Sequence, residues 1–374
     1  MELIVPIDER TRRRIDLIMS RDSSYFSLDD FVVRAILNQL TLEESRSARS
    51  GSSMEARLAS QVTLDAAPRW RAMSPKQLQV SQTTSSSAAV EVPRLDPRRL
   101  AQLNDSGDLM VLPPEVDARD RGIPLWGQIS RFAPGIFSLR ILGNLAREKG
   151  AAWVDLESAT GVVSDQAVAA RAALVENDEV NERERGYQLS TGFPQPDKVS
   201  KHRFTNQYLG YLAPRAGRPQ GLLSELCFVN MRKVESGRVE IGVTERGRKF
   251  ANLTSPLVDS ALISKGSPET GLSKEEVEFL TAHLKDSRPG ELEFLRFVVK
   301  SVAEGSGTPS ALLEATERYL TEIAVMPTLT PAIVSTMRAG AVSKLVEFGV
   351  VAISKEGARS HYSLKEEGAT LLGG

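Results

Sequence analysis

The chain has 374 residues and a formal net charge of -1; 41% of its residues are hydrophobic and 25% are charged, as in ordinary globular proteins of two or three domains. Its single cysteine, Cys227, excludes an intramolecular disulfide and a cysteine-rich metal site. No run approaches the roughly 18 to 20 apolar residues of a membrane span, so we expect a cytoplasmic protein without a membrane partner. Because the net charge is close to zero, any binding of nucleic acid must depend on local charge.

Residues 1–44 predict one short strand followed by two helices. The strand alternates apolar residues over 2–7, and the second helix begins at a capping-box-like pair, Ser27 and Asp30. This order resembles the ribbon–helix–helix family, in which two chains intertwine and their strands form a two-stranded ribbon. The resemblance implies a homodimer that is held together through residues 1–44, because the segment is too short to bury its own apolar face.

The outer face of the expected ribbon differs from the pattern of that family. The family reads bases in the major groove with polar or basic residues, whereas this strand offers Glu2, Ile4 and Pro6. We therefore interpret the segment as a dimerisation module without base reading. The basic run at 10–14 either touches phosphates or forms a solvated helix face.

Residues 45–115 predict a flexible linker. The periodic pattern stops there, and the segment is rich in serine, proline and alanine with balanced charges. Trp70 is an isolated aromatic residue that could dock on a partner or on the body of the protein. Such a tether would let a dimeric head carry two bodies at variable spacing.

The pattern helix, short helix, longer helix and hairpin recurs from residue 125 onward. Its first copy, 125–196, has a helix at "FSLRILGNLAREKG", a short helix at "WVDLESATG", a third helix capped by Ser164, and a hairpin over 178–190. This copy resembles a winged helix–turn–helix domain of the MarR-like sort. The resemblance implies a fold more than an activity.

A second copy is expected over 197–265, and a helical segment plus a third copy over 272–374. The second contains the phrase "VTERGRKFANL", with a helix that begins near Thr244, and the third contains "VVAISKEGARSHYSLKEEGATLL" after a long helix. An additional helix in the last range begins at the capping pair Ser273 and Glu276. The fold class is therefore mainly α with small β wings (α+β): an N-terminal ribbon–helix–helix followed by repeated winged helices.

Local charge separates the three copies. Residues 198–249 hold eleven lysines and arginines against four glutamates, a net of +7, whereas 137–190 and 272–374 each have a net of -3. Phosphate contacts require many cationic side chains, because counterion release supplies most of the affinity. The alternative for this basic segment is a solvated face with scattered ion pairs. The candidate DNA-binding residues are Lys198, Lys201, Arg203, Arg215, Arg218, Arg232, Lys233, Arg238, Arg246, Arg248 and Lys249.

The acidic copies offer fewer candidates. In the first copy, Ser164, Asp165, Gln166 and Arg171 could face a groove, although Asp165 would repel phosphates. The third copy adds Arg338 and Lys344 on its long helix and Arg359 on its wing. Winged helices also serve as protein-binding modules, so each acidic copy could bind DNA or another protein.

Catalytic motifs are missing from the sequence. It has no Walker-type loop, no His-Glu-x-x-His and no nucleophile elbow, and its three histidines lie in separate units. We therefore expect no enzymatic activity, no metal site and no cofactor. The favoured interpretation is a dimeric, nucleoid-associated protein that binds double-stranded DNA, as a transcriptional regulator or DNA organiser. The alternative is a tandem winged-helix scaffold subunit that binds protein partners in a larger complex, such as an SMC-like or defence complex.

Overall fold

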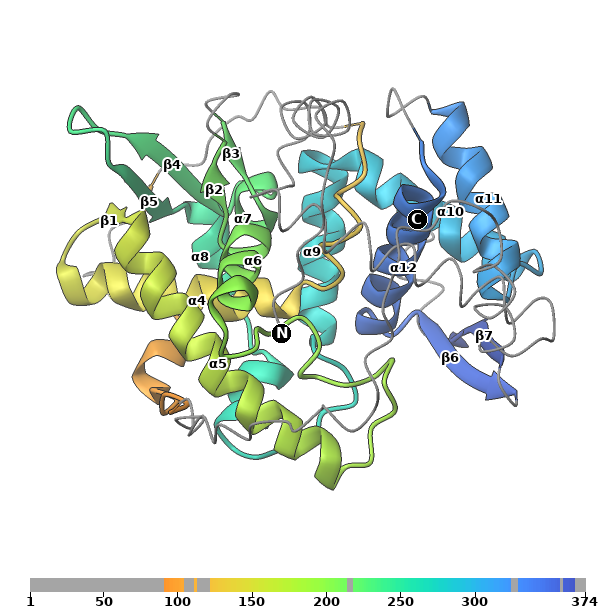
Figure 1. Cartoon of the computed structure of the whole chain (residues 1–374), viewed down its shortest axis with the longest axis horizontal. Helices are drawn as coiled ribbons and strands as arrows, with labels where there is room; N and C mark the ends of the chain where they lie inside the picture. Colours follow the sequence, from red (N-terminus) through yellow and green to blue (C-terminus); the bar gives the residue numbers. More distant parts are fainter. Residues whose placement is uncertain are drawn as a thin grey trace, which may run out of the picture. The chain divides into compact units, whose positions relative to one another are not determined.

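The computed structural model describes residues 91–103, 111–112, 122–213, 218–323, 329–356 and 359–366 (Figure 1). The chain divides into two units, 1–85 and 86–374, and the described residues all belong to the second. The expected ribbon–helix–helix head lies outside the described residues, as do most of the expected linker, Trp70 and Arg215. The predicted pairing of two chains through residues 1–44 therefore stays a prediction.

The described part of the chain is mainly helical with small antiparallel hairpins, which confirms the α+β class. The helical elements are η2 (Pro97–Leu100), α4 (Ala133–Lys149), α5 (Leu156–Val180), α6 (Lys198–Tyr208), α7 (Leu222–Glu225), α8 (Glu245–Ala251), the π-helix η3 (Pro256–Leu262), α9 (Lys274–Ser287), α10 (Pro289–Ala303), α11 (Pro309–Glu322) and α12 (Pro331–Glu347). The strands are β1 (Val154–Asp155), β2 (Tyr211–Leu212), β3 (Pro219–Gln220), β4 (Val229–Lys233), β5 (Val239–Val243), β6 (Val351–Glu356) and β7 (Arg359–Leu364).

One three-stranded sheet joins segments that are far apart in the sequence. Its order is β1-β5-β4, with Val154 of β1 and Met231 of β4 on either side of Ile241 in β5. Val154 and Ile241 are buried, so the inner face of this sheet contributes to the core. The ranges 125–196 and 197–265, which the sequence predicts as two winged helices, therefore share one sheet.

The helical part of the first expected copy differs from the prediction. Residues 156–180 form the single helix α5, whose N-cap is Asp155, and the predicted helix start at Ser164 is wrong. The Ser164 hydroxyl is buried within the helix and donates a hydrogen bond to the Gly161 carbonyl. A serine that bonds back to its own helix does not cap a new one.

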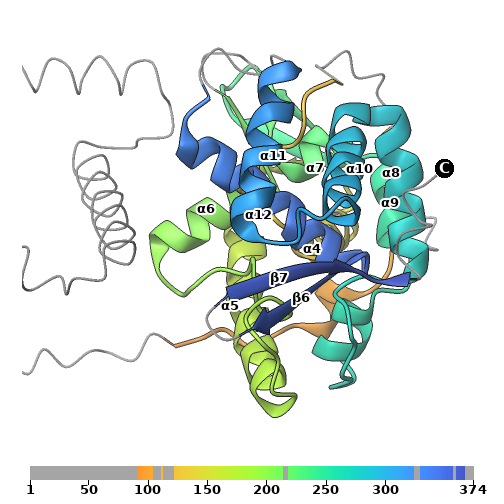
Figure 2. The ribbon, with the colours of Figure 1, turned by 90° about the vertical axis from the view of Figure 1, so that its right-hand side faces the viewer.

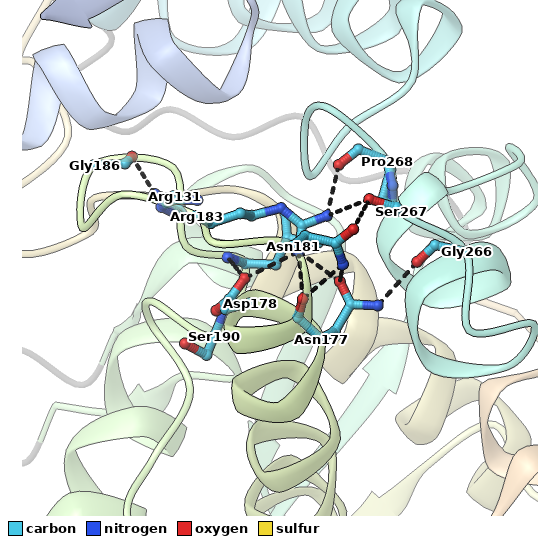
Figure 3. A network of polar contacts seen from close by, with 11 residues as sticks. Arg131, Asn177, Asp178, Asn181, Arg183, Gly186, Ser190, Gly266, Ser267 and Pro268 are labelled. Carbon is cyan, nitrogen blue, oxygen red and sulfur yellow. Dashed lines mark hydrogen bonds and ion pairs between the residues drawn. The ribbon is translucent and has the colours of Figure 1, made fainter.

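The predicted hairpin over 178–190 is also wrong, because the segment folds as turns around a buried carboxylate. Asp178 accepts hydrogen bonds from the backbone N–H groups of Leu189 and Ser190. Figure 3 shows Arg183 directed toward Asp178 and toward the 266–268 loop, where its guanidinium donates to the Pro268 carbonyl. These hydrogen bonds satisfy backbone N–H and C=O groups that would pair between the two strands of a hairpin.

Residues 91–103 pack against the helices of the described unit and do not form a flexible linker. We call this segment the strap. Leu100 and Leu103 are buried, and η2 packs on α4. The buried Arg140 side chain of α4 donates to the Leu100 carbonyl and forms an ion pair with Asp259. Further on, Leu112 exchanges backbone hydrogen bonds with Val243 and Glu245. The prediction of a flexible linker up to residue 115 is therefore wrong for 91–103 and 111–112.

Two buried carboxylates attach the C-terminal helices to the segment 122–132. Glu291 of α10 accepts a hydrogen bond from Leu125 N at 2.7 Å and pairs with Lys344 of α12. Glu347, at the end of α12, accepts hydrogen bonds from the backbone of Phe132 and Ala133 and so caps the first turn of α4. The expected long helix and hairpin over 331–364 are present as α12, β6 and β7.

Glu276 of α9 combines a confirmed capping box with an unusual environment. Its carboxylate accepts from Ser273 N while Ser273 caps the helix, as the sequence predicts. Burial raises the pKa of the Glu276 carboxyl to about 8 from its ordinary value of 4.5. Between these two values the folded protein holds a proton that the unfolded chain releases, so stability should fall as pH rises through this window and level off above it.

The variant Glu276→Gln should remove this pH dependence, because glutamine keeps the cap and stays neutral. We expect the free energy of unfolding of the unchanged protein to fall relative to the variant by at most about 1.4 kcal/mol per pH unit. Urea denaturation at several pH values between about 5 and about 9 measures the difference. Glu278→Gln, on an exposed carboxylate of the same helix, is the matched control. Parallel pH profiles for the chain and its Glu276→Gln variant would contradict the prediction.

Candidate nucleic-acid interface

The basic segment folds into elements on the surface of the described unit: α6, the hairpin β4–β5 and α8. Among the candidates of the basic segment that the structure describes, the exposed cations outside the ion pairs are Lys198 and Arg203 on α6, Arg218 beside β3, and Lys233 and Arg238 on the hairpin. Lys249 on α8 is exposed as well, with its Nζ 3.9 Å from Glu245. We call the five cations on α6, beside β3 and on the hairpin the basic surface; Figure 2 shows α8 on the opposite side of the described helices from α6.

The hairpin β4–β5 presents two of these cations beside its turn. Val234 N donates to the Arg238 carbonyl at 2.9 Å, and Gly237 has a φ of +82°, which glycine adopts without strain. Lys233 and Arg238 lie on either side of this turn and are exposed. Figure 1 shows the hairpin extending away from the helices, so both cations can approach a ligand without displacing another element.

Helix α6 presents the other group. Asp197 caps its N-terminus by accepting from Ser200 N, and Phe204, Thr205 and Tyr208 are buried on its inner side. Burial of this inner side against α5, α4 and α7 leaves Lys198 and Arg203 facing solvent. Figure 2 shows α6 at the margin of the described helices, with α5 and α4 on its inner side.

Several candidates of the basic segment are paired with carboxylates. Lys201 lies 2.8 Å from Asp165, Arg248 lies 2.8 Å from Glu245, and Arg232 lies 2.7 Å from Glu240. The Arg232 guanidinium also stacks 4.3 Å from the centre of the Trp153 ring. Exposed pairs of this kind contribute about 0–1 kcal/mol each, so a phosphate can compete for these cations. Arg246, on α8, is half-buried.

The prediction that Lys344 contacts DNA is wrong. Its side chain is 1% exposed, and its Nζ lies 2.5 Å from Glu291 Oε1 in the interior. A phosphate cannot reach an ammonium group that is enclosed between α12 and α10. The cation belongs to the core, where it neutralises a carboxylate.

Arg338 and Arg359, the other candidates of the third expected copy, differ in their surroundings. Arg338 is half-buried and donates to the Tyr362 hydroxyl at 3.0 Å, so it connects α12 to β7. Arg359 is exposed on β7. Within the described part of the chain, no hydrogen bond or ion pair joins either residue to the basic surface.

The long helix α12 is covered on one face by the segment around Gly127. Gly127 N–H donates to Met337 Sδ at 3.1 Å. The backbones pack so closely that a Cβ added at Gly340 would lie 2.2 Å from the Gly127 carbonyl oxygen. This face of α12 is therefore closed to a DNA groove.

Two of the residues that could read a groove in the first expected copy, Asp165 and Gln166, are also engaged elsewhere. Gln166 binds the strap, accepting from Asp96 N at 2.8 Å, and Asp165 pairs with Lys201. Helix α6 begins at Lys198, a helix start that the sequence analysis does not predict. The signal was present, since Asp197 is a good N-cap and Phe204 and Tyr208 recur at helical spacing.

Comparison of the chain with protein-family models, curated proteins and solved structures found no match. Across the described ranges, no helix has the length and apolarity needed to cross a membrane. Those same ranges contain no cluster of three or more histidine, cysteine, aspartate or glutamate side chains that could hold a metal ion.

Proposed function

We propose that this protein binds double-stranded DNA through the basic surface, as a nucleoid-associated regulator or organiser of DNA. The observation that carries the proposal is the placement of cations from separate sequence segments on α6, beside β3 and on the β4–β5 hairpin, where they stay exposed. An array of exposed lysines and arginines suits a phosphate backbone, because each contact releases counterions. The protein acts by binding and not by catalysis.

The order of elements supports the proposal. Helix α4, strand β1, helices α5 and α6 and the hairpin β4–β5 come in this order, with the small hairpin β2–β3 and α7 between α6 and β4, and β1 pairs with β5. This order resembles a single winged helix that extends over both the first and the second expected copies. In such domains a helix and the hairpin approach the duplex together. Pairing of two chains through residues 1–44 would give each dimer two such surfaces.

One observation favours the alternative, a scaffold subunit that binds protein. Helices α10, α11 and α12 followed by β6 and β7 also have a winged-helix order, but the covered face of α12 and the acidic charge of 272–374 do not suit DNA. This C-terminal region would then serve protein contacts, alone or beside DNA binding by the basic surface.

Titration of the full chain with labelled random-sequence duplex, at low and at raised salt, tests the proposal. We expect binding whose affinity falls steeply with salt, with a slope of about -0.9 per phosphate contact. A low-salt titration without binding would overturn DNA binding and leave the scaffold function. Single-stranded DNA of the same length serves as the comparison ligand.

A further inference from the structure

Helix α6 has an outward face whose chemistry differs from that of the rest of the basic surface. Val199 is 64% exposed there, and His202 and Arg203 are also exposed. Asn206, half-buried, follows one turn later. These positions recur at intervals of three and four residues, so they form one row along the helix. The row holds an apolar group, an imidazole, a guanidinium and an amide.

Val199 lies on the outer side of α6, away from the residues that the helix buries. The inner side of α6 already buries Phe204, Thr205 and Tyr208. An aliphatic side chain gains no binding free energy from contact with a phosphate, whereas it does gain some from contact with the methyl group of thymine. The cations Lys198 and Arg203 flank Val199 on the same helix, and the local net charge of +7 attracts a polyanion more strongly than it attracts a protein of average charge.

The amide of Asn206 is held in a defined position. Its Nδ2 lies 3.1 Å from His202 Nε2. With that ring nitrogen as the acceptor, Asn206 keeps a second N–H and its Oδ1 for other partners. One donor and one acceptor side by side match the N7 and N6 edge of adenine in the major groove, and Arg203 has the donors that a guanine edge accepts.

The helix that directly precedes the basic hairpin offers no comparable row. Helix α7 has four residues, of which Leu222, Leu223 and Ser224 are buried. Helix α6 has 11 residues and is therefore about 16 Å long, which suits the major groove. The small hairpin β2–β3 and α7 separate it from β4 in the chain.

From this row we infer that α6 is the base-reading element and that the protein prefers particular duplex sequences, with Val199, Arg203 and Asn206 contacting base edges. The inference rests on the proposed function and deepens it from sequence-blind attraction to sequence recognition. The cations on the hairpin position the duplex, and the row on α6 selects among sequences.

Repeated selection of the full chain on a pool of random duplexes tests the inference. We expect enrichment of a short motif that the chain binds more tightly than a scrambled duplex. Val199→Ala and Asn206→Ala should each reduce that preference about 5- to 100-fold, as expected for the loss of one base contact. Because both substitutions are neutral, the affinity for the scrambled duplex and its salt slope should stay unchanged. Val180→Ala, at a more exposed valine on α5, is the matched control.

The outcomes separate the inference from the proposed function. Binding of the pool without enrichment would overturn base reading by α6 and leave sequence-blind DNA binding in place. Enrichment that survives both substitutions would place base reading outside this row and would also overturn the inference. If the pool does not bind at low salt, DNA binding itself is lost, and the exposed row becomes a protein-binding surface instead.

Discussion

Replacing Lys344 by methionine should lower the free energy of unfolding by about 3–5 kcal/mol, because it leaves the Glu291 carboxylate buried without a counter-charge. Both side chains are fully enclosed, and Lys344 Nζ lies 2.5 Å from Glu291 Oε1. Methionine has a similar length and tests the charge more than the volume. The midpoint and slope of urea denaturation measure the change.

The double variant Lys344→Met with Glu291→Gln separates loss of the pair from loss of packing. Glutamine keeps an oxygen for the hydrogen bond from Leu125 N, and no buried charge is left unpaired. We expect the double variant to recover most of the stability that the single variant loses. If Lys344→Met were as stable as the unchanged chain and bound DNA more weakly, Lys344 would be a DNA contact, as the sequence had suggested.

The features that the sequence predicted correctly depend on neighbouring residues. The capping box of Ser273 and Glu276, the helix that begins after Thr244 and the hairpin over 351–364 are all set within about 15 residues of chain. Local backbone bonding and the spacing of apolar residues determine these elements. Their prediction needs no knowledge of the remaining fold.

The features that were missed depend on contacts between distant segments. Nothing near Val154 indicates that its strand pairs with Ile241, and without that pairing the ranges 125–196 and 197–265 read as separate copies. Asp178 organises the following turns through its bonds to Leu189 and Ser190, which no periodicity reveals. Turns therefore stand where the hairpin over 178–190 was predicted.

Lysines and arginines were the hardest residues to place from the sequence. Lys344 follows Ala341 by three residues and Met337 by seven, so helical spacing puts it on the buried side of α12. Treating every lysine as a surface charge concealed that signal. Arg203 and Lys233 carry no such signal, and the structure leaves them exposed. Net charge located the basic segment, but only the fold shows which of its cations face solvent.

Simultaneous replacement of the exposed cations on α6, beside β3 and on the β4–β5 hairpin should have the largest effect on DNA binding. The variant replaces five residues by alanine: Lys198, Arg203, Arg218, Lys233 and Arg238. If Arg203 contacts a base edge and each of the other four contacts one phosphate, the slope of log affinity against log salt becomes shallower by about 3 to 4 units, and affinity at moderate salt falls roughly 100-fold or more. Anisotropy titrations of one labelled duplex over a range of salt concentrations measure both quantities.

A second variant with the same change in net charge distinguishes a local surface from the overall charge. It replaces exposed cations outside the basic segment by alanine: Lys274, Lys285, Lys300, Arg318 and Lys355. Distant charges are screened beyond about 8–10 Å at physiological salt, so this variant should bind almost as the unchanged chain does. Equal losses of affinity in the two variants would mean that binding depends on the total charge of the protein. The basic surface would then not be the DNA-binding site. A loss confined to the first variant would locate the phosphate contacts on α6, beside β3 and on the β4–β5 hairpin.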